Sequence, residues 1–189
     1  MQRFRQLMFV LSLLALNWFG MMAVHELGHV LGAIATGGSI ERVVLHPLAI
    51  SRTDVAPNPH PAIVVWLGPI TGCVLPLGAL FAVPRRFRFA QGTAQFFAGF
   101  CLIANGAYIS IGWFDQVGDC REMLQTGTPV WVMVLFGVAA IPSGLCLWHG
   151  LGSVKQFITN PKLVSPQMAY SAVSALVILV ALESALSPR

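Results

Sequence analysis

The sequence predicts an all-α membrane protein with about five transmembrane helices and a small β-hairpin-like segment after the first helix. Two observations support this prediction. Hydrophobic residues occupy 56% of the 189 positions and charged residues only 10%, whereas a soluble domain carries about 25% charged residues. Apolar runs also recur along the chain, each long enough to cross a hydrocarbon core, which takes about 20 residues. The length fits a single integral membrane domain, residues 1–189.

The expected spans follow from where the apolar runs begin and end. The first run stops at Gly37, and glycine commonly ends a helix. The second contains Gly68 and Gly72, and small residues let membrane helices pack closely. The fourth is expected to be interrupted at 142–144, a Pro-Ser-Gly sequence, and a loop is expected over 150–166. The five predicted spans are residues 4–35, 62–83, 95–114, 129–147 and 168–182.

The segment between the first two spans has a strand-like pattern. β-Branched and other apolar residues over 40–45 and 50–55 flank a turn at His46-Pro47, which predicts two short strands. Such a hairpin can present an edge to an extended peptide. An ordinary surface loop is the alternative, and the sequence does not decide between them. His46 and His60 are interpreted as loop residues rather than metal ligands.

Composition excludes several other classes of protein. The four cysteines form no CxxC pair, so we expect no disulfide framework. The net charge is +4, but the basic residues are too few and too dispersed for a nucleic-acid surface. Arg3 and Arg5 precede the first apolar run, as in a signal peptide. That run is longer than the usual 7–15 residues or so of a signal peptide, and we expect it to be retained.

The distribution of charge predicts an orientation. With five spans, the side of the N-terminus holds basic residues and no acidic ones: Arg3, Arg5, Arg85, Arg86, Arg88, Lys155 and Lys162. The other side holds both signs: Arg42, Arg52, Arg121, Arg189, Glu41, Asp54, Asp115, Asp119, Glu122 and Glu183. The positive-inside rule then places the N-terminus in the cytoplasm. The second half of the first span and Asp119 fall together on the opposite side.

The sequence His-Glu-Leu-Gly-His at 25–29 lies inside the first span. His25 and His29 share one face of a helix, because residues four apart are neighbours, and together they can bind one zinc ion. Glu26 lies near that face and can act on a metal-bound water. No other ionisable residue occurs between 7 and 35, and ionisable groups inside a membrane usually mark a functional site. The alternative is a pair of histidines that only form hydrogen bonds within a helix bundle.

A catalytic zinc site commonly has three protein ligands, so a carboxylate is needed at the same depth. Asp119 and Asp115 both qualify by topology, and Glu122 is a weaker third candidate. Asp119 could instead be the N-cap of a short helix that follows it. Asn105 lies inside the third span, where an amide needs either an interhelical partner or a catalytic role. Cys120 is interpreted as a bystander.

These residues resemble the site-2 protease family of intramembrane zinc metallopeptidases. The 25–29 motif is similar to the family's HExxH helix, and Trp-Leu-Gly-Pro-Ile-Thr-Gly at 66–72 is similar to its Gly-Pro segment. Asn105 followed by Gly-Asp-Cys-Arg-Glu-Met-Leu at 118–124 is similar to its third core helix, although the family has Asp-Gly where this chain has Gly-Asp. The resemblance covers residues 8–125, a three-helix catalytic core without a PDZ domain. Residues 126–189 would add two further transmembrane helices.

The resemblance implies zinc bound by His25, His29 and Asp119, with Glu26 as general base and Asn105 as a donor to the oxyanion. It implies a metalloendopeptidase that cleaves membrane-spanning protein or peptide substrates within the lipid bilayer, in a bacterial cell membrane. The family's zinc lies toward the cytoplasm, opposite to the charge rule, so the orientation stays open. The alternatives are a zinc hydrolase acting on a lipid or small amide, and a zinc-binding membrane scaffold, sensor or transporter.

Overall fold

The computed structural model describes residues 1–151, 156–157 and 159–187. It confirms an α-helical protein with five helices that are long and apolar enough to cross a membrane, and these indicate a multi-pass membrane protein. They are α1 (Gln2–Thr36), α2 (Pro61–Ala82), α3 (Arg88–Ile111), α5 (Val130–His149) and α7 (Pro166–Leu186). The shorter elements are β1 (Ile40–Val44), β2 (Arg52–Val55), α4 (Asp119–Gln125) and the 3₁₀ turn η1 (Pro161–Leu163).

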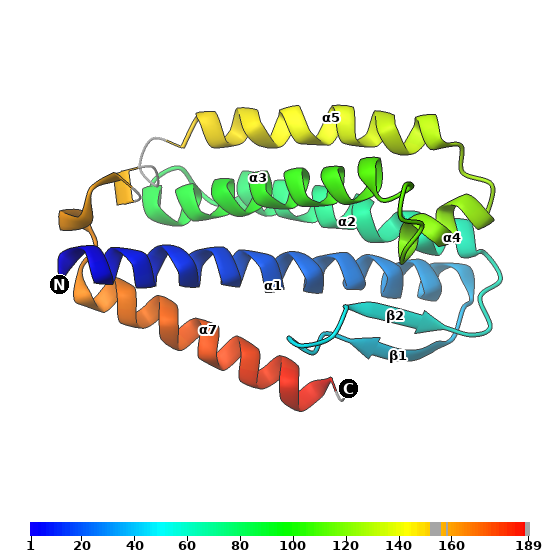
Figure 1. The fold of residues 1–189 in the computed structure, drawn as a ribbon, viewed down its shortest axis with the longest axis horizontal. Coiled ribbons are helices and arrows are strands. Elements are labelled where there is room, and N and C mark those ends of the chain that lie inside the picture. The colour runs from blue at the N-terminus through cyan, green and yellow to red at the C-terminus, as the bar shows by residue number, and fades with distance from the viewer. Residues whose placement is uncertain (152–155, 158, 188–189) are drawn as a thin grey trace.

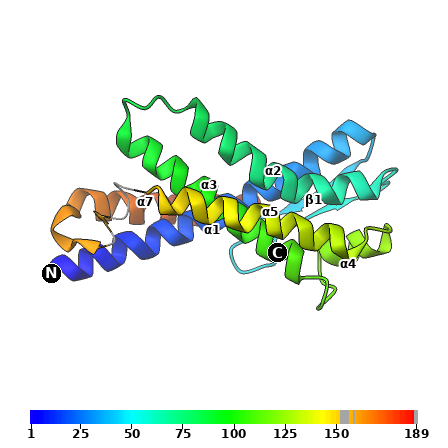
Figure 2. The ribbon, with the colours of Figure 1, turned by 90° about the horizontal axis from the view of Figure 1, so that it is seen from above.

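The long helices lie roughly side by side, with α7 on one side of α1 and α2, α3 and α5 on the other (Figure 1). Helix α2 packs on α1, α3 packs on α2, and α5 covers α3, while α7 lies on the other side of α1. Figure 2 shows that α2 crosses over the second half of α1 at an angle. Close approach depends on glycine, because a Cβ at Gly28 would overlap the carbonyl oxygen of Leu67 on α2. This contact brings the 25–29 motif directly against the second helix.

Two of the expectations about the long helices are wrong. Helix α3 begins at Arg88 instead of 95, because backbone hydrogen bonding continues through a polar first turn that an apolar run does not include. Helix α5 continues through Pro142, whereas an interruption at 142–144 was expected. Proline is tolerated inside membrane helices when neighbouring groups compensate for its missing N–H. Part of the loop expected over 150–166 lies outside the described residues, including Lys155.

The predicted hairpin is confirmed as a two-stranded antiparallel sheet. Val43 pairs with Thr53, Val44 pairs with Arg52, and the register is irregular between Ile40 and Arg42. The hairpin lies along the second half of α1, next to the start of α2 (Figure 1). Strand β2 therefore runs beside the helix that carries the 25–29 motif.

Candidate metal centre

The three residues of the motif that carry chemistry are all buried on α1. His25 is 7% exposed, Glu26 is 3% exposed and His29 is 5% exposed. The two imidazole rings lie edge to face with their centroids 4.9 Å apart, as expected for residues four positions apart on one helix. Burial of such groups is costly unless they have partners. The surrounding contacts are therefore informative about what the motif can do.

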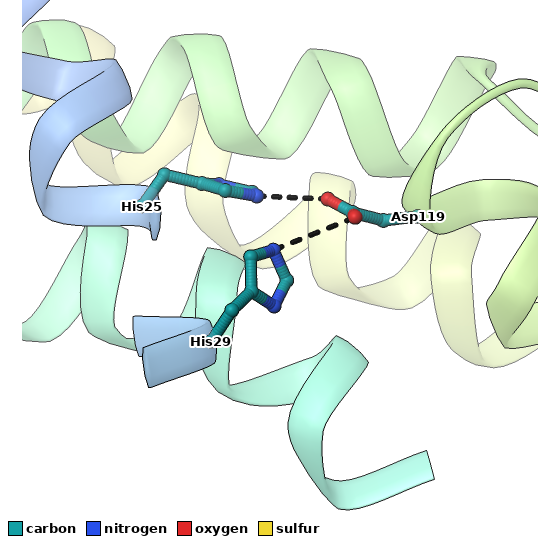
Figure 3. Close-up of side chains that lie close together, drawn as sticks. All are labelled: His25, His29 and Asp119. Atoms are coloured by element: carbon teal, nitrogen blue, oxygen red, sulfur yellow. Dashed lines mark hydrogen bonds and ion pairs between the residues drawn. The ribbon is translucent and has the colours of Figure 1, made fainter. Parts of the chain in front are cut away.

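The structure brings Asp119 to these histidines from 90 residues farther along the chain (Figure 3). Its Oδ2 lies 2.8 Å from His25 Nε2, and its Oδ1 lies 3.4 Å from His29 Nε2. One ligand atom from each of the three residues lies within 4.8 Å of the others. Two imidazole nitrogens and a carboxylate oxygen form a donor set that catalytic zinc sites use. Zinc bonds of about 2.0–2.1 Å place ligand atoms about 3.4 Å apart in a tetrahedron, so the 2.8 Å and 3.4 Å separations here would need only a small shift to admit such an ion.

A glycine and a tyrosine put Asp119 in this position. Gly118 is the N-cap of α4 and has a φ of 56°, a conformation that favours glycine. The Asp119 N–H donates to the hydroxyl oxygen of Tyr108 on α3, 3.0 Å away. The alternative interpretation of Asp119 as an N-cap does not hold, because Asp119 is the first residue of α4 and no side chain caps that helix. Its carboxylate is therefore available to face the histidines.

Both imidazole rings are oriented from behind through their Nδ1 atoms. His25 Nδ1 lies 2.6 Å from Oδ1 of Asn105 on α3, and His29 Nδ1 lies 2.9 Å from the carbonyl oxygen of Val64 on α2. Because each partner is an acceptor, each Nδ1 donates its proton, and each Nε2 is the ring nitrogen that faces Asp119 and that could bind a metal ion once deprotonated. This is the arrangement by which proteins orient metal-binding histidines. Sequence reasoning did not identify the carbonyl of Val64, which carries no side-chain signal.

Asn105 is only 1% exposed and has partners on both sides of its amide. Its Oδ1 faces His25, and its Nδ2 donates to the carbonyl oxygen of Cys101 at 2.9 Å. Gly72 on α2 provides the space for it, because a Cβ there would lie 2.7 Å from Asn105 Nδ2. Both alternatives from the sequence had placed Asn105 at an important position. Its contact with His25 is a hydrogen bond between α3 and α1 that orients the imidazole ring.

Gly68 on α2 lies directly against the imidazole pair. A Cβ at this position would overlap Cε1 and Nε2 of His29 and would lie 2.9 Å from Nε2 of His25. The glycine therefore leaves room for both rings at the atoms that face Asp119. The Gly-Pro segment at 66–72, noted from the sequence, lies directly against the candidate centre.

Strand β2 contributes the direct partner of Glu26. The hydroxyl of Thr53 donates to Glu26 Oε2 at 2.8 Å and lies 3.5 Å from the carbonyl oxygen of the same residue. The sequence did not single out Thr53, because only the fold brings the hairpin against α1. This contact ties a buried carboxylate to a strand at the protein surface.

An open cleft of about 490 Å³ reaches the candidate centre. It is bounded by the hairpin, the start of α2 and the start of α4, and its lining residues include His29, Thr53, Val64 and Asp119. Figure 3 shows the carboxylate of Asp119 facing both imidazole rings. Water and an extended chain segment can therefore approach the side of the rings that carries Nε2.

The carboxyl group of Asp119 is held in its ionised form. Burial raises the pKa of the carboxyl group, but hydrogen bonds and charge interactions with His25 and His29 outweigh that effect and lower the pKa below its ordinary range. Glu122 also lines the cleft, and burial followed by repulsion from Asp119 raises its pKa. An ionised carboxylate beside two imidazoles is the state that a divalent cation requires.

The remaining candidates lie elsewhere. Asp115 is exposed and does not join the His25, His29 and Asp119 group among the described residues. Cys120 is fully buried and its thiol donates to the carbonyl oxygen of Tyr108 at 3.5 Å, so it anchors α4 to α3. His46 accepts a hydrogen bond from the backbone of the hairpin turn.

No protein-family model, curated protein or solved structure matches this chain. The functional interpretation therefore depends on the chemistry and geometry of the site.

Proposed function

We propose that the protein is an intramembrane zinc metalloprotease that hydrolyses peptide bonds of membrane-spanning substrates. One observation carries the proposal. Two buried histidines and a distant aspartate converge on one point, both histidines are oriented through Nδ1, and a glutamate follows the first of them on the same helix. The resemblance of residues 8–125 to the site-2 protease family supports the same conclusion.

His25, His29 and Asp119 would hold the zinc ion, each through one ligand atom. Zinc held there supplies a Lewis acid and a bound water with a pKa near 7. Asn105 and the carbonyl of Val64 keep the rings from rotating by accepting their Nδ1 protons. These outer partners matter because removing one typically weakens metal affinity by about 10–100-fold.

Glu26 is the proposed general base. Thr53 donates to Oε2, so Oε1 is the oxygen proposed to take the proton of the attacking water and deliver it to the leaving amide nitrogen. The same hydrogen bond fixes the rotamer of the carboxylate. Thr53 is therefore a positioning residue in the proposed reaction rather than a participant in bond making.

The hairpin is the proposed docking element for the scissile segment. All four residues of β2 line the cleft, and in the described two-stranded sheet β1 pairs with only one edge of β2. An extended peptide can add to a free strand edge through backbone hydrogen bonds. A substrate helix must unwind to do so, which also exposes the peptide bond to hydrolysis.

The expected oxyanion role of Asn105 is replaced in this proposal by a positioning role. Its Oδ1 accepts from His25 and one N–H of its Nδ2 donates to Cys101, so the observed contacts of the amide orient the His25 ring. Asn105→Asp keeps an acceptor for His25 and is expected to retain zinc, whereas Asn105→Leu removes the acceptor. Zinc content measured on both variants separates the two roles.

The test of the proposed function is Glu26→Gln, with zinc content and cleavage measured on the same sample. The purified protein in lipid nanodiscs is incubated with a panel of transmembrane peptides, and products are identified by mass spectrometry. We expect the variant to keep zinc and to lose cleavage by at least about 1,000-fold. Full cleavage by the variant would refute the mechanism. Hydrolysis of lipid vesicles that contain no peptide would favour a lipid hydrolase, and zinc binding without any hydrolysis would favour a scaffold, sensor or transporter.

A further inference from the structure

A second cavity lies at the opposite end of the helix bundle from the candidate metal centre. It has a volume of about 310 Å³ and lies between the α2–α3 turn, the first two turns of α3 and the end of α5. Its lining residues are Arg85, Arg88, Gln91, Gly92, Gln95, Gly150 and Leu151. This is the end of the molecule that holds the N-terminus (Figure 1). The proposed proteolytic mechanism uses none of these residues.

The cavity is electropositive because no described carboxylate pairs with its arginines. In the part of the chain that the structure describes, the one arginine in a salt bridge is Arg52, at the other end of the molecule. No acidic residue occurs at positions 1–25, 55–114 or 123–182, and these ranges include every residue that lines the cavity. Arg85 and Arg88 are exposed, and neither has a carboxylate partner among residues 1–151, 156–157 and 159–187. An anion entering the cavity would therefore meet two unopposed guanidinium groups.

The polar lining suits an anion with several oxygens. Guanidinium groups present forked donors that match phosphate oxygens. Gln91 adds a side-chain amide on the same face of α3, one turn after Arg88. Gln95 is fixed by its own bond, since its Nε2 donates to the carbonyl oxygen of Leu147 at 2.7 Å and so ties α3 to α5. The far wall of the cavity is therefore braced between two helices.

We propose that this cavity binds a phosphate group, with the headgroup of an anionic membrane lipid as its principal source. The α2–α3 turn joins two membrane-length helices, and Phe81, Phe87 and Phe89 around it are all more than half exposed. Apolar side chains flanking arginines place the turn at a membrane surface, where lipid phosphate is abundant. Basic pockets between transmembrane helices are recognised sites for such headgroups.

Arg86 offers a matched control. It lies between the two cavity arginines in sequence, carries the same charge and does not line the cavity, and its guanidinium lies 4.9 Å from the ring centroid of Phe87. A general attraction of basic residues to anionic lipid would involve Arg86 equally. A specific binding site in the cavity would depend on Arg85 and Arg88 but not on Arg86.

The experiment measures phosphatidylglycerol binding to the full chain by native mass spectrometry, in a phosphatidylcholine background. We expect Arg85→Gln and Arg88→Gln each to weaken binding about five-fold, and Arg86→Gln to change it by less than about two-fold. Either single variant is a sufficient test if the other folds poorly, and thermal unfolding in phosphatidylcholine monitors folding. Equal losses in all three variants, or no loss in any, would overturn the proposal.

A second arm distinguishes the source of the phosphate. Inorganic phosphate at millimolar concentration is added to the wild-type complex with the lipid. Displacement of the lipid would mean that the cavity takes the phosphate group itself, and resistance to displacement would mean that it requires the lipid-anchored form. Displacement and resistance to displacement both support the site if the Arg85 and Arg88 variants lose lipid binding. If those variants keep lipid binding, neither result supports it.

Discussion

Gly68→Ala is predicted to damage the candidate metal centre from a neighbouring helix. The new Cβ would lie 2.9 Å from His25 Nε2 and would overlap the His29 ring, whereas ordinary contacts begin at 3.4 Å. His25 Nε2 would have to move by about 0.5 Å, and the His29 ring by more. Metal–ligand distances tolerate only about 0.2 Å. The substitution adds one methyl group and removes no ligand, so its effect reports geometry alone.

We expect Gly68→Ala to weaken zinc affinity by about 100-fold or more, since even losses of outer partners cost about 10–100-fold. Affinity is measured by titration against a zinc chelator in nanodiscs. The matched control is Gly78→Ala on the same helix, where a Cβ would meet nothing within 4 Å. Thermal unfolding of the zinc-free forms measures the overpacking cost, expected near 1–3 kcal/mol for Gly68→Ala only. Wild-type zinc affinity in Gly68→Ala would refute the proposed position of the ion.

Three further predictions concern the parts that surround the centre. Thr53→Val is expected to lower kcat about ten-fold with KM nearly unchanged, because the hydrogen bond to the Glu26 carboxylate is lost. Thr53→Ser should recover most of the activity. Equal activity in the Val and Ser variants would contradict the positioning role. Gly118→Ala should weaken zinc binding about ten-fold. Its Cβ would lie 2.5 Å from the Tyr108 hydroxyl, which accepts the hydrogen bond from the Asp119 N–H. Gly127→Ala also has a positive φ but open space, and should leave zinc binding unchanged. Asp119→Asn should abolish stoichiometric zinc, measured by atomic emission, whereas Asp115→Asn should retain it; the reverse result would identify the other aspartate as ligand.

The parts of the fold that were predictable from the sequence are those with a local signal. Membrane-length apolar runs identify the long helices, and the turn at His46-Pro47 between β-branched residues identifies the hairpin. The spacing of His25 and His29 predicts that their imidazole rings are neighbours, because residues four apart share a helix face. Apolar runs do not define helix ends equally well. The first turn of α3 is polar yet helical, and Pro142 lies inside a continuous α5.

The parts of the site that were not predictable depend on contacts between distant segments. Thr53 reaches Glu26 only because the hairpin lies along α1, and Val64 reaches His29 through a backbone oxygen that any residue type supplies. Asn105 was identified as significant because an amide inside a span needs a partner. Its role could not be inferred, because the same amide can donate to an oxyanion or accept from an imidazole. The observed bond to His25 Nδ1 favours the second role.

The order of Gly118 and Asp119 also has a physical explanation. A ligand aspartate at the start of a short helix needs a chain reversal immediately before it and a partner for its own N–H. Gly118 provides the reversal at φ 56°, and the hydroxyl of Tyr108 receives the N–H. Helix α4 is then held by Cys120, whose thiol contacts the carbonyl of the same tyrosine. Because Tyr108 lies one turn after Asn105 on α3, that helix fixes the aspartate and His25 together, and a shift of α3 would move both at once.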